Sequence, residues 1–296
     1  MFDLRYHVAS LAAVFIALVI GILVGVALAS HGLGNTERDR LQEDLRRAQA
    51  QSDALKLQVD TLAEGGIGDR AFVERTYKLV MANRLKGAKV AVLFVGSIDG
   101  DRRAMITRAL NDAGAQPIRV RALTVPIDEA KLEKRLANRP FLAAYAGPNQ
   151  LEELGHALGQ EFAAGKDTPL WNALQNLIVE ETIGSPKRPA DGVVIVRTAE
   201  PQVGATARFL KGLYGGIDDV GVPAVGVETS RDTVSSVKAF QQAGLSTVDD
   251  VETQIGKLAL VALLSDPSVA GDYGMKKTAH DGPLPDIAPL PATAGG

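Results

Sequence analysis

The chain has 296 residues, of which 46% are hydrophobic and 23% are charged, a composition that argues against wholesale disorder and against a multi-span membrane protein. Its formal charge of −3, from 32 basic and 35 acidic residues, provides no basic surface for nucleic acid, so we expect no nucleic-acid partner. The chain contains no cysteine, which excludes disulfides, thiol nucleophiles, zinc fingers and iron–sulfur ligation.

The first feature along the chain is an uncharged apolar run from Leu11 to Ala29. At about 1.5 Å per residue, a helix of this length crosses the roughly 30 Å hydrocarbon core of a bilayer. We therefore predict an N-terminal segment, 1–32, with a transmembrane helix at about 10–29 that contacts membrane lipid. Two alternatives stay open: a buried helix of a soluble core, and a signal peptide cleaved after Ala29. The run is longer than the apolar region of a signal peptide, which favours an uncleaved anchor.

Charge alone leaves the orientation of this helix open. Arg5 precedes the span, whereas Arg38, Arg40 and Arg46 follow it, so the positive-inside rule places the body of the chain in the cytoplasm. Those arginines alternate with acidic residues, however, and long domains are translocated largely regardless of charge.

Two consecutive segments carry patterns typical of helix association. Small residues recur at every fourth position of the predicted span and would let two helices approach closely: Ala17, Gly21, Gly25 and Ala29. Residues 33–66 are predicted to form a coiled coil, because apolar residues follow one another at alternating spacings of four and three: Leu41, Leu45, Ala48, Leu55, Val59 and Leu62, with Ser52 at a seam position. A lone amphipathic helix on the main domain is the alternative. Together the two segments predict a parallel homodimer.

A globular α/β domain is predicted over 67–266, after Gly65, Gly66 and Gly68 end the coiled coil. Short apolar runs alternate with helical patterns, which indicates a Rossmann-like, doubly wound and mostly parallel sheet. Strands are predicted at 89–95, 118–122, 141–146, 192–196 and 224–227, with a short segment at 246–248. Helices are predicted at 69–85, 101–112, 128–137, 150–164, 170–182, 205–213, 233–243 and 252–264. The alternation of Arg119 and Arg121 with apolar residues predicts a half-exposed strand. Proline and glycine from 267 to 296 predict a disordered tail.

Ligands of such sheets bind beyond the carboxyl ends of the strands, which directs attention to four loops: residues 96–101, 147–149, 197–200 and 228–230. The first loop has neither G-x-G-x-x-G nor a P-loop, and its Ser, Asp and Gly are ordinary turn and capping residues. The adjacent carboxylates Glu180-Glu181, Asp218-Asp219 and Asp249-Asp250 do not face one another, so we interpret them as solvated, capping or turn residues. We predict no catalytic residues and no enzyme.

No cofactor and no metal ligands are predicted. The four histidines are scattered along the chain and form no ligand pair: His7, His31, His156 and His280. Copper(I) prefers thiolate and thioether ligands, and this chain has no cysteine and few methionines.

Three segments resemble the actinobacterial MctB family, usually named copper transporter. They are the opening MFDLRYHVASLAAVFIALVIGILVG, the following coiled coil, and STVDDVETQIGKLALVALLSDPSVAGDYG near the C-terminus. The family motif corresponds to Val248–Thr253, Ala259–Val261 and Tyr273–Gly274. The resemblance implies a protein attached to the cell membrane with its body outside the cytoplasm, associated with copper transport or homeostasis, in which copper is the transported ion. Related SteB proteins imply instead a septal envelope role beside a membrane partner, SteA.

Two functional hypotheses follow, with a degenerate Rossmann enzyme as a third. The family name implies copper transport. The residues favour a dimeric envelope or septum scaffold whose α/β head binds a protein partner, because a single apolar span has no polar stripe for an ion path.

Overall fold

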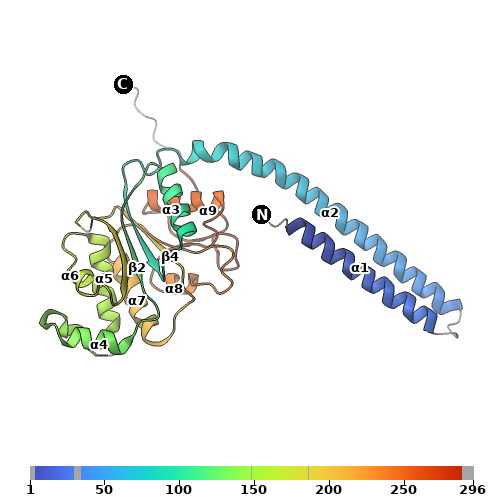
Figure 1. Cartoon of the computed structure of the whole chain (residues 1–296). Coiled ribbons are helices and arrows are strands. Elements are labelled where there is room, and N and C mark those ends of the chain that lie inside the picture. Colours follow the sequence, from blue (N-terminus) through green and yellow to red (C-terminus); the bar gives the residue numbers. More distant parts are fainter. Residues whose placement is uncertain (1–3, 30–34, 148, 186, 289–296) are drawn as a thin grey trace, which may run out of the picture. The chain divides into compact units, whose positions relative to one another are not determined.

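The computed structural model describes residues 4–29, 35–147, 149–185 and 187–288. The chain divides into two compact units, Met1–Asp69 and Arg70–Gly296. The first unit is helical and the second holds the sheet (Figure 1).

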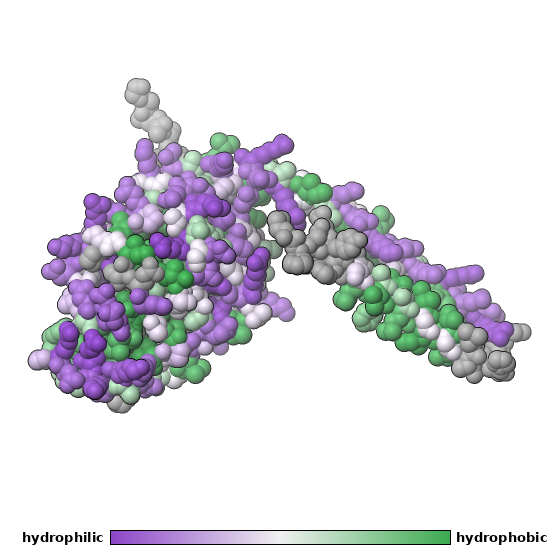
Figure 2. Space-filling model, in the orientation of Figure 1, coloured by the Kyte–Doolittle hydropathy of each residue, from purple (hydrophilic) through white to green (hydrophobic). Residues whose placement is uncertain are grey.

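The first helix, α1 (Leu4–Ala29), is apolar along most of its length. Its window Ser10–Ala27 has a mean hydropathy of 2.8, and none of that window is buried within the chain. Figure 2 shows this continuous hydrophobic surface, whereas the surface of the next helix is mostly hydrophilic. A core helix of a soluble fold would be buried, so that alternative does not fit; length and composition suit a membrane span.

The second helix, α2 (Asn35–Met81), corrects the prediction that Gly65, Gly66 and Gly68 end a separate stalk. The helix runs through all three glycines and includes most of the helix expected from residue 69. An interior glycine costs only about 1 kcal/mol relative to alanine and keeps both of its backbone hydrogen-bonding groups, so strong helix formers on either side outweigh it. Phe72, in the last third of this helix, is 68% exposed.

The second unit contains a sheet of seven strands in the order β3-β2-β1-β4-β5-β6-β7. The strands are β1 (Lys89–Val95), β2 (Gln116–Leu123), β3 (Val179–Gly184), β4 (Gly192–Arg197), β5 (Ala224–Val227), β6 (Ser246–Val248) and β7 (Asp272–Tyr273). All neighbouring pairs are parallel except β2 and β3. The order reverses direction between β1 and β4, as at the switch point of doubly wound sheets.

Helices cover both faces of this sheet (Figure 1). They are α3 (Gly100–Asp112), α4 (Glu129–Ala137), the 3-10 helix η1 (Pro140–Tyr145), α5 (Leu151–Ala164), α6 (Pro169–Ala173), α7 (Gly204–Asp218), α8 (Val237–Gln241) and α9 (Gln254–Ser265). One core lies between the sheet and α5 and α7, and the other lies between the sheet and α3 and α9. The α/β prediction is thereby confirmed.

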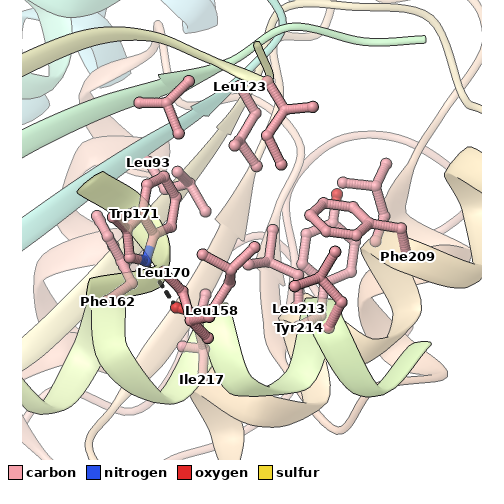
Figure 3. Packing of buried hydrophobic residues seen from close by; sticks show 14 of the residues in the cluster. Leu93, Leu123, Leu158, Phe162, Leu170, Trp171, Phe209, Leu213, Tyr214 and Ile217 are labelled. Atoms are coloured by element: carbon pink, nitrogen blue, oxygen red, sulfur yellow. Dashed lines mark hydrogen bonds between the residues drawn. The ribbon is translucent and has the colours of Figure 1, made fainter. Parts of the chain in front are cut away.

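Aromatic residues fill the core beneath α5 and α6 (Figure 3). The rings of Phe162 and Trp171 lie 5.5 Å apart in a tilted arrangement. The Trp171 indole nitrogen donates a hydrogen bond to the Leu158 carbonyl at 2.9 Å, so the one polar atom of this ring is satisfied in the core.

Helices α5 and α7 cross at backbone contact through four glycines. A Cβ atom on Gly155, Gly159, Gly212 or Gly216 would lie 1.9 to 2.2 Å from a carbonyl oxygen of the opposite helix. Each helix therefore carries a G-x-x-x-G face that fits against the other, the arrangement also used by closely packed membrane helices.

Two predictions about secondary structure are wrong. Residues 141–146 form most of the 3-10 helix η1 instead of a strand, because Pro140 opens the segment and only Leu142 is buried. The helix predicted at 170–182 ends at Ala173, and its second half becomes the antiparallel strand β3. In both segments the apolar run is short and mixes helix-forming with strand-forming residues, so its pattern did not distinguish a helix from a strand.

The strand with alternating arginines is buried on both faces, contrary to the half-exposed prediction. Arg119 and Arg121 are only 2% and 3% exposed. Arg119 donates to the carbonyl oxygens of Phe162 and Arg188, and Arg121 donates to Ile183 at 2.9 Å. Burial lowers the pKa of Arg119, to about 10. Backbone carbonyls therefore accept hydrogen bonds from two arginines that the sequence pattern placed in water, although Arg119 Nε has no partner among the described residues.

The predicted disorder from residue 267 is also wrong as far as residue 288. Strand β7 pairs with β6, and Asp272 accepts hydrogen bonds from Thr247 at 2.6 Å and Gln241 at 2.7 Å. The segment has few apolar residues, but polar contacts with the sheet edge order it. Residues 289–296 lie outside the described part of the chain.

Candidate functional site

The loops after β1, β4 and β5 converge at the carboxyl edge of the sheet, as predicted from their positions. A Cβ atom on Gly96 would lie 2.6 Å from the Thr198 hydroxyl, so the first two loops touch. The predicted loop at 147–149 is not part of this edge, because no strand precedes it. Gly147 instead donates its N–H to Glu133 at 2.9 Å, and residue 148 lies outside the described residues.

Asp99 in the first loop is an N-cap, in agreement with its interpretation as a capping residue. Its Oδ1 accepts hydrogen bonds from the N–H groups of Asp101 at 2.9 Å and Arg102 at 3.0 Å. This cap begins α3 so that Arg102, in its first turn, reaches the neighbouring loops.

Arg102 forms a two-pronged ion pair with Asp232, with nitrogen–oxygen distances of 3.0 and 2.8 Å. Burial alone would lower the pKa of Arg102, but the Asp232 hydrogen bonds raise it overall. Burial acts in the opposite sense on Asp232, whose pKa is nevertheless lowered by Arg102 and Thr229. Both groups are therefore held charged.

Two further cations and a second carboxylate extend this pair into a partly buried ion network, defined as Arg102, Arg197, Glu228, Asp232 and Lys276. Lys276 Nζ lies 2.6 Å from Glu228 Oε1 and donates to the Asp232 carbonyl at 2.9 Å. Arg197 Nη1 lies 3.6 Å from Asp232 and 3.8 Å from Glu228. The network ties the ends of β4 and β5 to the C-terminal segment.

The motif at 248–253 contacts the segment that follows the Tyr273-Gly274 pair, so two motif parts that are distant in sequence lie together in the fold. Asp249 accepts hydrogen bonds from the N–H groups of Met275 at 2.8 Å and Lys276 at 3.2 Å. Gly274 has φ +139°, and a Cβ there would lie 2.0 Å from Asp249 Oδ1. The acidic side chain needs a glycine opposite it, so these motif residues hold the C-terminal segment to the sheet.

Asp250 is fully buried and has one carboxylate oxygen, Oδ1, without a hydrogen-bond partner. Burial raises its pKa to about 6, against the hydrogen bond from Thr253. Of the interpretations offered for this pair, the solvated one is wrong, because Asp249 and Asp250 are only 1% and 0% exposed.

A pocket of about 290 Å³ opens beside the ion network, between the ends of β1 and β4 and helices α7 and α8. We call it the switch pocket, because it lies where the strand order reverses. Its charged lining residues are Arg197, Glu200, Arg208 and Lys211, and its apolar lining includes Val95, Leu210 and Tyr214.

Metal-ligating side chains do not gather in the described part of the chain, where no group of three His, Asp or Glu residues could hold an ion. His156 instead pairs with Asp219 at 2.8 Å on the surface. His7 and His31 lie outside the residues whose side chains are described.

Most of the residues predicted to mediate dimerisation are exposed where they are described. Nothing lies within 4 Å of a Cβ built on Gly21 or Gly25. Leu55 and Val59 are 60% and 61% exposed. Ala17 and Ala48 are also exposed, Leu41, Leu45 and Ser52 are half-buried, and the side chains of Ala29 and Leu62 lie outside the described set.

Comparison with known proteins identifies the family that the three sequence segments resemble. The family model described as copper transport outer membrane protein, MctB, matches residues 1–283. The chain belongs to the MctB family. Proteins named copper transporter MctB from Mycobacterium bovis and Mycobacterium tuberculosis are each 24% identical to it over 309 residues, covering 95% of this chain and 97% of the relative.

Proposed function

We propose that this chain is a non-enzymatic, membrane-anchored cell-envelope protein that acts in copper transport or homeostasis. The observation that carries the proposal is the match to the MctB family over residues 1–283, which includes the apolar helix α1 as well as the α/β head. The names of the mycobacterial relatives supply the copper role.

The proposed topology is a single pass through the cell membrane, with the body of the chain outside the cytoplasm. Helix α1 is the one candidate span found among the described residues. A lone apolar helix offers no polar path for an ion, so copper would cross only through a larger assembly or a partner. Copper is thus the proposed substrate of the system in which this chain takes part.

A deletion strain tests the copper role. We expect higher cellular copper and growth inhibition at lower copper concentrations than in the parent strain, both restored by the intact gene. Normal copper content and normal copper tolerance in the deletion strain would reject the proposal.

The second candidate is a dimeric envelope or septum scaffold, which the exposed faces of α1 and α2 favour. A single copy leaves Leu55 and Val59 largely in solvent, and a parallel coiled coil would cover them. A transmembrane partner of the SteA kind would then bind the head.

Microscopy of the same deletion strain separates the two candidates. The scaffold role predicts malformed septa with unchanged copper content, and the copper role predicts the reverse. Complementation with Leu55→Asp sharpens the test: this variant should fail to restore the septa, whereas Leu57→Asp, on the opposite face of α2, should restore them.

A further inference from the structure

The lining of the switch pocket is predominantly cationic. Three positive side chains face one negative side chain among its lining residues: Arg197, Arg208 and Lys211 against Glu200. Glu200 is 74% exposed, so water screens its charge, whereas the Arg197 side chain is only 4% exposed.

Arg197 is incompletely satisfied, although it is buried. Its Nε donates to the Ala199 carbonyl at 2.8 Å and its Nη2 donates to Glu200 at 3.1 Å. Its Nη1 has no hydrogen-bond partner and only the longer contacts to Asp232 and Glu228. A buried guanidinium nitrogen without an acceptor is uncommon in folded proteins; this one faces the carboxylates of Asp232 and Glu228, and Arg197 also lines the switch pocket.

Arg208 supplies a second positive charge at the mouth of the pocket. It lies on α7, is exposed, and has no ion-pair partner among the residues that the structure describes. Lys211, one turn further along α7, already pairs with Glu152 at 2.6 Å.

Much of the remaining lining is apolar, with Gln202, Ser236 and Gln242 as its polar members. Val95, Leu210 and Tyr214 are 4%, 6% and 4% exposed and form the inner wall. The volume of about 290 Å³ lies at the small end of ligand pockets, so it suits a small molecule.

We propose that the switch pocket binds a small organic anion, with its carboxylate or phosphate group beside Arg197 and Arg208 and its apolar body against Val95, Leu210 and Tyr214. The lining contains no soft metal ligand and no residue of α1 or α2, so the proposal does not rest on copper binding or on dimerisation. It would make the head a receptor for an anionic small molecule in the envelope.

Isothermal titration calorimetry on the full chain in lipid nanodiscs tests this site with three probes of similar size: benzoate, phenyl phosphate and the neutral isostere benzamide. We expect saturable binding of at least one anion and about tenfold weaker binding of benzamide, the loss of one charge-assisted hydrogen bond. The tighter anion identifies the head group as carboxylate or phosphate.

Three variants assign the binding to the pocket. Arg208→Gln should weaken the anion about fivefold, Arg208→Lys should restore most of the affinity, and Arg139→Gln, an exposed arginine on another part of the head, should change nothing. Failure of both anions to bind, equal binding of benzoate and benzamide, or unchanged binding by Arg208→Gln would each overturn the proposal.

Discussion

The same G-x-x-x-G spacing occurs in two regions of this molecule with opposite surroundings. In α5 and α7 the glycines meet the backbone of the opposite helix, with Gly212 closest, 1.9 Å from the Glu152 carbonyl to an added Cβ. In α1, Gly21 and Gly25 have nothing within 4 Å. Spacing alone therefore does not say whether a small-residue face is occupied; the surrounding contacts do.

The contrast separates small-residue faces that are packed within one chain from those that are left exposed. In the α/β head, the glycines of α5 and α7 pack against each other's helix within one chain, so they serve the folding of the head. Gly21 and Gly25 of α1 and Leu55 and Val59 of α2 remain exposed within one copy, and our account assigns these positions to a second copy.

The largest expected effect on stability comes from adding a side chain where α5 and α7 are already in backbone contact. Gly212→Ala places a methyl group against the backbone of α5, which cannot move aside as a side chain could, so we expect a loss of about 3 kcal/mol or more in the free energy of unfolding. Gly215→Ala, in the same helix with open space around it, should raise stability by about 0.5 to 1 kcal/mol. Urea denaturation followed by Trp171 fluorescence measures both, and similar stabilities would contradict the tight crossing.

The next effect comes from charging the seam of α2. Leu55→Asp would bury a carboxylate between two helices, so we expect the dimer dissociation constant to rise about tenfold or more. Leu57 is similarly exposed, at 69%, but lies on the opposite face, so Leu57→Asp should leave dimerisation unchanged. Sedimentation equilibrium in detergent reports the mass; equal behaviour of the two variants would exclude this seam.

A smaller effect is expected in α1. Gly25→Ile would hold two membrane helices apart and weaken association about fivefold, without changing the stability of the head. Energy transfer between labelled copies in vesicles measures association, and urea denaturation provides the control. An unchanged association would remove α1 from the interface.

A pH-dependent effect involves another glycine contact, between Gly256 and Asp250. Since the pKa of Asp250 rises from 3.8 to about 6 on folding, the carboxyl takes up a proton on folding between these pH values, and stability falls as pH rises through them. Asp250→Asn, which stays neutral, should exceed the native chain by about 1 to 2 kcal/mol above pH 6 and match it below about pH 4. Asp167→Asn controls for the lost charge; a constant difference at all pH values would contradict the assignment.

The strands that bury both faces were predictable from sequence, because continuous apolar runs such as residues 89–95 and 224–227 have few other interpretations. Residues 141–146 have a similar composition but follow Pro140 and form a 3-10 helix. The C-terminal segment escaped prediction for a different reason: its order depends on polar contacts with residues distant in sequence, such as Asp249, and hydrophobic patterns do not report these.

The position of the candidate site was predictable from sequence, but the side chains that form it were not. Strand order brought the expected loops together, whereas Arg208 on α7 and Lys276 in the C-terminal segment reach the edge from elements whose placement only the fold determines. Arg102 did carry a signal: a cation in the first turn of a helix opposes the helix dipole, which indicates a carboxylate partner such as Asp232.

The central claim is that α1 and α2 pair with a second copy, and the cysteine-free sequence permits a direct test by single-cysteine crosslinking in native membranes. Our account predicts that Leu55→Cys forms a disulfide-linked dimer under mild oxidation, while Leu57→Cys stays monomeric. Monomers with both variants, or equal crosslinking of the two, would contradict it.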